Sequence, residues 1–147
     1  MRNRAGIILI EENKLALIER RRQGRHYFAF PGGGIDKGES AEQTAIREAE
    51  EELGITVEIN QKVAEIIFHQ GSQAYFLVKK TGGEFGTGTG DEYGEYDPAH
   101  GIYLPLWMPL EDVLKKNVVP RELAEYVIRS HQQGWQTEPV VIFEDNK

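Results

Sequence analysis

The chain has 147 residues, of which 39% are hydrophobic and 28% charged, with a net charge of −7 and no cysteine. This composition excludes disordered, collagen-like and coiled-coil proteins and predicts one folded domain over residues 1–147. Without cysteine there are no disulfides or thiolate ligands, and the excess of acidic residues disfavours a polynucleotide partner. No apolar run is long enough for a membrane span or signal peptide, so we expect a cytoplasmic protein.

The first part of the chain predicts two β-hairpins that flank a helix. Strands are expected at Ala5–Ile10, Leu15–Ile18, Tyr27–Phe30, Val63–Phe68 and Ala74–Val78. The first two of these are expected to pair as one hairpin and the last two as another. A helix is expected over residues 40–53, because Ser40 and Gln43 form a capping box and Gly54 is a typical helix stop.

The second part of the chain predicts a long loop at residues 82–101, rich in Gly, Glu and Asp, followed by further regular elements. These are a strand at Ile102–Met108, helices at Pro109–Leu114 and Arg121–Gln132, and an apolar run at Val140–Phe143. The last run is either a final strand or an oligomer contact, which leaves a homodimer open. Intermixed strands and helices predict an α/β or α+β fold with a mixed sheet covered by helices.

Three carboxylates gather on one edge of the helix expected at residues 40–53. At about 100° per residue, Glu48, Glu51 and Glu52 lie within one arc beside an apolar stripe. They repel one another and lie at the negative end of the helix dipole. A hard divalent cation such as Mg²⁺ would compensate the repulsion, because it prefers oxygen ligands. The alternative is a solvated acidic face that Arg47 partly screens.

A longer motif surrounds these acids and favours the metal site. The pattern G-x5-E-x7-R-E-U-x-E-E-x-G-U is matched by Gly33, Glu39, Arg47, Glu48, Glu51, Glu52, Gly54 and Ile55. This pattern is the signature of the Nudix hydrolases, which the chain resembles over residues 33–55. One departure is Ala49, where the family usually has a larger aliphatic residue. The resemblance implies an α/β/α sandwich that hydrolyses a nucleoside diphosphate linked to another moiety.

The resemblance also implies roles for individual residues. Glu48, Glu51, Glu52 and the backbone carbonyl of Gly32 would bind Mg²⁺, with Mn²⁺ as the alternative ion. Arg47 would orient Glu48 through a charge-assisted hydrogen bond, and Glu39 would anchor the loop to the helix.

Two interpretations stay open for the general base. Glu48 is one candidate, and the other is a carboxylate of the long acidic loop, where Glu92 and Glu95 lie.

Substrate contacts are expected from the strand that precedes the glycine-rich loop and from the loop itself. Arg20 or Arg21 would contact substrate phosphate, unless the run of arginines is merely solvated. Gly33 would let the backbone approach the substrate closely. The aromatic candidates for base recognition, each also suited to an ordinary core role, are Tyr27, Phe28, Tyr75 and Phe76.

Three functions are compatible with these residues. The main hypothesis is a MutT-like enzyme that acts on a small phosphorylated nucleotide, either a nucleoside triphosphate or a modified nucleotide, and releases a monophosphate and pyrophosphate. A non-catalytic nucleotide-sensing Nudix module is a second hypothesis, although sensing alone does not require all three acids. Removal of pyrophosphate from RNA 5′ ends is a third, which meets the charge objection raised above.

Overall fold

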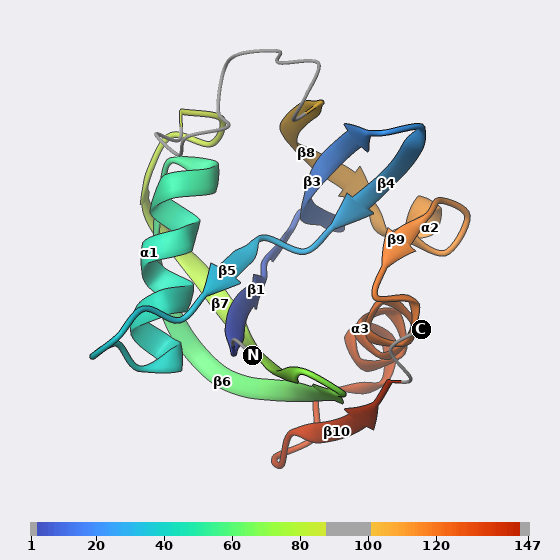
Figure 1. The fold of residues 1–147 in the computed structure, drawn as a ribbon. Helices are drawn as coiled ribbons and strands as arrows, with labels where there is room; N and C mark the ends of the chain where they lie inside the picture. Colours follow the sequence, from blue (N-terminus) through green and yellow to red (C-terminus); the bar gives the residue numbers. More distant parts are fainter. Residues whose placement is uncertain (1–2, 88–100, 145–147) are drawn as a thin grey trace.

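The computed structural model describes residues 3–87 and 101–144, in which five strands precede the first helix and the remaining strands and helices are intermixed (Figure 1). The helices are α1 (Ala41–Leu53), α2 (Leu110–Val113) and α3 (Arg121–Gln133). The strands are β1 (Arg4–Ile8), β2 (Ile10–Glu11), β3 (Lys14–Arg22), β4 (Arg25–Ala29), β5 (Gly32–Gly34), β6 (Ile55–Phe68), β7 (Gly71–Gly83), β8 (Ile102–Pro109), β9 (Val118–Val119) and β10 (Val140–Phe143). The predicted helices are confirmed, as are the β6–β7 hairpin and the final strand.

One sheet has the N-terminal strand in its interior. Its order is β10-β6-β7-β1-β5, with β1 parallel to β7 and antiparallel to β5. Gly6 of β1 lies opposite Gly32 of β5, and a Cβ on Gly6 would come within 2.7 Å of the Pro31 carbonyl oxygen. The glycines therefore let the two backbones approach closely, and this approach fixes the glycine strand β5 against the sheet.

The second sheet is built around β3, which pairs with β2, β4 and β8, while β9 pairs with β4. Gln23 and Gly24, with φ of 53° and 78°, form the two-residue turn of the β3–β4 hairpin. This turn places Arg22 opposite Arg25 and Arg20 opposite Tyr27. The register decides which side chains of β3 face the other sheet.

Helices cover both sides of the strands, with α1 on one side and α3 on the other (Figure 1). Helix α1 buries Ala45, Ala49 and Leu53 in one apolar cluster, and α3 buries Leu123 and Val127 in a second. The expected α/β fold with helices on both faces is therefore confirmed, with its strands divided between two sheets. Within residues 3–87 and 101–144, no helix is long and apolar enough to span a membrane.

The ends of α1 are fixed by the predicted caps. The backbone N–H of Gln43 donates to the Ser40 hydroxyl at 3.1 Å, and the Ser40 N–H donates to the Gln43 side chain at 2.8 Å. Gly54 ends the helix in the left-handed conformation, with φ of 77°. Both caps were expected, and together they fix the rotation and length of the helix that carries the acids.

Several predicted strands differ from the structure. The hairpin of 5–10 with 15–18 is wrong in its pairing, because only Ile10 and Glu11 pair with β3 while β1 joins the other sheet. The expected loop at 82–101 begins later, since β7 extends through Gly83. Strands β5 and β9 were not predicted, because three glycines and two valines carry no alternating pattern.

Candidate active site

Arg47 of α1 is the hub that joins the helix to the glycine-rich loop. Its guanidinium donates to Glu39 at 2.7 Å, to the Gly34 carbonyl at 3.1 Å, and more weakly to Glu48 and Glu51 at 3.2 and 3.3 Å. The Arg47 hydrogen bond lowers the pKa of Glu39 to about 2, while Glu39 raises the pKa of Arg47. The loop and helix are therefore held together by charge-assisted bonds.

Glu52 lies between β5 and β8, with each carboxylate oxygen accepting one hydrogen bond. One oxygen accepts from the Gly32 backbone N–H at 2.8 Å, and the other accepts from the Tyr103 hydroxyl. Burial raises the pKa of Glu52 to about 7, against the opposing effect of the Tyr103 bond. A carboxylate in this position is costly to ionise unless a cation lies nearby.

Glu48 lies directly against the glycine strand. A Cβ on Gly33 would lie 2.1 Å from a Glu48 carboxylate oxygen, so the observed position of this carboxylate depends on the glycine. Burial raises the pKa of Glu48, and Arg47 opposes this shift. The structure thus places Glu48 and Glu52 beside Gly32 and Gly33.

The third predicted metal ligand, Glu51, has a different orientation. Its carboxylate faces Arg47, and 42% of its side chain is exposed. Among the described residues, no three acidic or histidine side chains form a group arranged to hold a metal ion. The structure therefore brings two of the three predicted acids to the glycine strand and leaves the third at Arg47.

The donor chemistry of this region fits a hard divalent cation. Burial raises the pKa values of the Glu48 and Glu52 carboxylates, and a neighbouring acid raises each further, Glu51 for Glu48 and Glu48 for Glu52. A cation would offset the cost of ionising them, and oxygen ligands are those that Mg²⁺ prefers. The Gly32 backbone, bonded to Glu52, lies beside the same carboxylates.

A cavity of about 340 Å³ opens on Glu52 and Gly32. Other residues that line it come from both sheets and include Arg4, Arg20, Tyr27, Gln73, Tyr75 and Tyr103. The cavity is therefore bordered by two arginines, several aromatic rings and an acid of α1. Positive charge, stacking surfaces and carboxylates together suit a phosphorylated ligand that carries a ring system.

The arginines predicted to contact phosphate lie on opposite faces of β3. Arg20 lines the cavity, and its Cζ atom is 4.8 Å from the centre of the Tyr103 ring. Arg21 lies on the other face, where its Nε atom is 3.4 Å from Glu19. The two loop acids, Glu92 and Glu95, lie outside the described residues.

The aromatic candidates also separate by location. Tyr27 and Tyr75 line the cavity, whereas Phe28 and Phe76 pack against or within the apolar clusters. Tyr103, which bonds Glu52, was not identified from the sequence. No sequence signal marks it, because its position depends on the register of β8 against β3.

Comparison with known proteins decides the family. The sequence profile of the NUDIX domain matches residues 1–127. The chain belongs to the Nudix family. It is accordingly a Nudix hydrolase that acts on pyrophosphate bonds, and the sensing module proposed as an alternative is set aside.

The curated Nudix relatives include RNA pyrophosphohydrolases. That of Pseudoalteromonas atlantica is 31% identical over 128 residues, which cover 72% of each chain. For two further RNA pyrophosphohydrolases, the match covers only 33% and 28% of their own lengths. The expectation that a polynucleotide is not the partner is therefore unsupported.

Solved Nudix structures confirm the fold. A NUDIX hydrolase from Nitrosomonas europaea superposes with a TM-score of 0.74 at 18% identity, covering 99% of this chain and 79% of that one. A structure described as MutT from Aliivibrio salmonicida and Vibrio cholerae superposes with a TM-score of 0.67 at 24% identity, covering 88% and 98%. At these identities the likeness concerns the fold alone.

Proposed function

We propose that this Nudix hydrolase removes pyrophosphate from the 5′ end of RNA. The observation that carries the proposal is the 31% identity to the RNA pyrophosphohydrolase of Pseudoalteromonas atlantica over 72% of both chains. The cavity beside Glu52 supports it, because about 340 Å³ lies at the small end of ligand pockets and suits one terminal nucleotide. The rest of an RNA chain would then lie outside the cavity.

The reaction would add water across a phosphoanhydride bond. The oxygen of water would bond to phosphorus, the bridging P–O bond would break, and the proton of the water would pass to a base. The products would be pyrophosphate and an RNA with a 5′-monophosphate. Arg20, on the cavity wall, would neutralise phosphate charge there, whereas Arg21 pairs with Glu19 on the opposite face of β3.

The same site would hold Mg²⁺, or Mn²⁺ in its place, through the residues named from the family motif. Glu48 and Glu52 lie beside the glycine strand, so they and the Gly32 carbonyl would supply ligands, with Glu51 turning from Arg47 to join them. When bound, the ion would supply positive charge to the phosphate oxygens. Arg47 would keep Glu48 in position, and Tyr103 would keep Glu52 in position.

The general base remains a choice between two kinds of residue. Glu48 is close to the glycine strand, and burial raises its pKa, which makes it a stronger base than an exposed glutamate. Glu92 and Glu95 are the alternatives from the long loop. Single replacements of each acid by Gln, compared by kcat at a Mg²⁺ concentration that saturates each variant, identify the base as the residue whose loss lowers kcat most.

A MutT-like hydrolysis of nucleoside triphosphates is the second candidate. The cavity size favours it as well, since a single nucleotide would fill the space beside Glu52. The chemistry and the predicted ligands would be the same for both substrates. Only the part of the substrate beyond the first nucleotide distinguishes them.

Pyrophosphate release decides between these two functions. With Mg²⁺, we expect kcat/KM for a 5′-triphosphorylated RNA to exceed that for free nucleoside triphosphates by at least about tenfold. Glu52→Gln serves as the inactive control for contaminating phosphatases. A higher kcat/KM for the free nucleotides would establish the MutT-like function instead.

A further inference from the structure

The cavity face of the β3 sheet extends beyond the cavity as a row of arginine and tyrosine side chains. Residues directly opposite in an antiparallel sheet share a face. Arg20 lies opposite both Tyr27 and Tyr103, and the next row outward on the same face holds Arg22 opposite Arg25. We call these five residues the Arg–Tyr ladder.

The ladder pairs its cations with aromatic rings. The Cζ atom of Arg20 is 4.8 Å from the Tyr103 ring centre, and that of Arg25 is 4.8 Å from the Tyr27 ring centre. Arg20, Tyr27 and Tyr103 line the cavity, so the ladder begins inside it. The successive rows lie about 7 Å apart, because alternate residues of a strand share a face.

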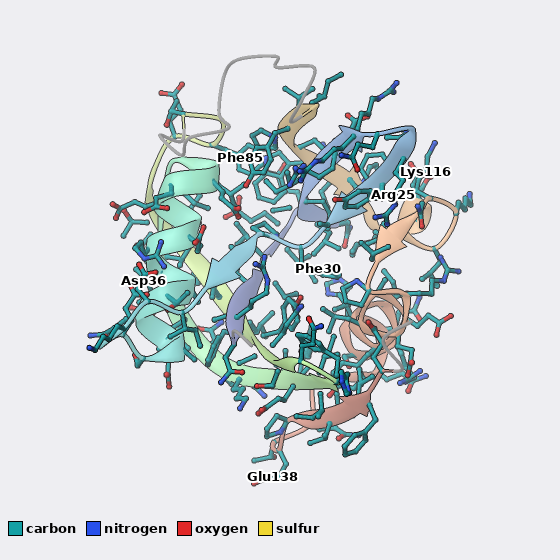
Figure 2. The ribbon with its side chains drawn as sticks, in the orientation of Figure 1. Arg25, Phe30, Asp36, Phe85, Lys116 and Glu138 are labelled. Atoms are coloured by element: carbon teal, nitrogen blue, oxygen red, sulfur yellow. The ribbon has the colours of Figure 1, made fainter. Side chains whose placement is uncertain are left out.

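The outer row of the ladder is exposed and positively charged. Arg22 and Arg25 are both exposed at the end of the β3–β4 hairpin, where Figure 2 shows Arg25. Across residues 3–87 and 101–144, neither guanidinium forms an ion pair with an acid. The chain as a whole has a net charge of −7, whereas this outer row is positive and lies one row beyond the cavity residues Arg20 and Tyr27.

We infer that the ladder binds the nucleotides that follow the 5′-terminal one in single-stranded RNA, an inference that rests on the proposed function. Single-stranded nucleic acids are bound by positive grooves that contain aromatic stacking surfaces, which is the composition of this strip. The ladder also answers the charge objection, because counterion release depends on local cations rather than on the net charge of the protein. Its direction, from Glu52 outward, matches a chain held by its terminal phosphates.

The test compares a double variant, Arg22→Ala with Arg25→Ala, with a matched control. Lys79→Ala with Lys80→Ala removes the same charge from β7, several residues beyond the cavity residues Gln73 and Tyr75. For 5′-triphosphorylated RNA of about ten nucleotides, kcat/KM should fall at least tenfold in the ladder variant and less than about twofold in the control.

Two further readouts separate the ladder from a general loss of activity. Hydrolysis of a free nucleoside triphosphate should change less than about twofold in the ladder variant, since one nucleotide does not reach the outer row. The slope of log kcat/KM against log salt should become shallower by about 1.4, which corresponds to two lost phosphate contacts on a single strand. If kcat/KM for the RNA of about ten nucleotides is unchanged in the ladder variant, the inference that the ladder binds RNA is wrong.

A measurement of RNA binding tests the inference even if the protein does not hydrolyse RNA. Should the wild type act only on free nucleotides, the proposed function fails, and the ladder is then judged by fluorescence anisotropy with a 5′-monophosphorylated single-stranded RNA. Weaker binding by the ladder variant than by the lysine control would support the ladder. Equal binding by both variants, or no binding by the wild type, would refute it.

Discussion

At the scale of single residues, Glu52 shows how the site balances burial against charge. Its carboxylate is removed from water, which raises its pKa to about 7, yet it accepts hydrogen bonds from the Gly32 N–H and the Tyr103 hydroxyl. The two bonds orient the carboxylate but do not cancel the cost of ionising it. A bound cation would therefore stabilise the ionised Glu52, and without a cation the ionised carboxylate lowers the free energy of unfolding.

Replacing Glu52 by Gln removes the cost of ionising this buried carboxylate, so the variant should be more stable than the wild type at high pH. The folded-state pKa of about 7 lies above the unfolded value of 4.5, so stability falls as pH rises from about 4.5 to 7 and stays low above it. In metal-free buffer, Glu52→Gln should raise the free energy of unfolding by roughly 1–3 kcal/mol at pH 8 and leave it nearly unchanged at pH 4.5. Urea denaturation at both pH values measures the difference.

The control for this prediction is Glu50→Gln on the exposed face of α1. It should change stability little at either pH, because surface substitutions rarely exceed about 0.5 kcal/mol. A loss of stability in Glu52→Gln at pH 8 would mean that the ionised carboxylate stabilises the fold, contrary to this account.

Some residues of the site could be predicted from the sequence, and others could not. Glu48, Glu52 and Arg47 follow from a short motif on one helix, where spacing alone fixes the face. Tyr103 contributes through a strand 51 residues further along, and the choice of Arg20 over Arg21 depends on the register of the β3–β4 hairpin. Period-two alternation separates Arg20 from Arg21, but the buried face is known only once the sheet is assembled.

At the scale of elements, the unit formed by β5 and α1 functions as one piece. Arg47 bonds the helix to Gly34 and Glu39, and the Glu48 carboxylate lies where a Cβ on Gly33 would displace it. Because the helix and the loop are tied at several points, a small change in the glycine strand is transmitted directly to the carboxylates.

Gly33→Ala should therefore separate folding from activity. The new Cβ would displace the Glu48 carboxylate, and misplacement of a reacting group by about 1 Å costs on the order of a hundredfold in rate. We expect kcat to fall by about that factor while the circular dichroism spectrum stays that of the wild type. Gly82→Ala is the control, because its Cβ would meet nothing closer than 3.9 Å.

An unchanged kcat in Gly33→Ala would show that Glu48 does not need this position for the reaction. A protein that failed to fold would be recognised by its lost spectrum.

The elements themselves differ in how far the sequence predicts them. Helix α1 was predictable because its caps, Ser40 with Gln43 and Gly54, are local signals that the structure confirms. The pairing of β1 was not, because an apolar run has the same composition whether it pairs with β3 or with β7. Strand partners depend on contacts between distant segments, which periodicity does not contain.

At the scale of the whole molecule, two sheets and one helix enclose a site whose buried carboxylates are costly to ionise. Glu48 and Glu52 come from α1, the glycine strand from one sheet, and Arg20 and Tyr103 from the other. Binding of a cation between these parts would stabilise the folded state as a whole, because the unfolded chain has no such arrangement.

Mg²⁺ should therefore raise the unfolding temperature at pH 8. At about ten times its dissociation constant, the ion contributes about 1.4 kcal/mol to the free energy of unfolding. The shift is measured by differential scanning calorimetry against NaCl of equal ionic strength. The double variant Glu48→Gln with Glu52→Gln should lose the shift, and an equal shift in that variant would place the ion elsewhere.

The interior position of β1 has a consequence for biosynthesis. The ribosome delivers Arg4–Ile8 before both neighbours of this strand, and one of them, Gly71–Gly83, emerges only after α1 and β6. Until then the edge of β1 that later meets β7 has no partner, and β5 rests on a strand that is itself unsupported on one side. The nascent chain thus contains α1 well before the sheet of β1, β5, β6 and β7 is complete. The candidate active site is therefore assembled late in synthesis.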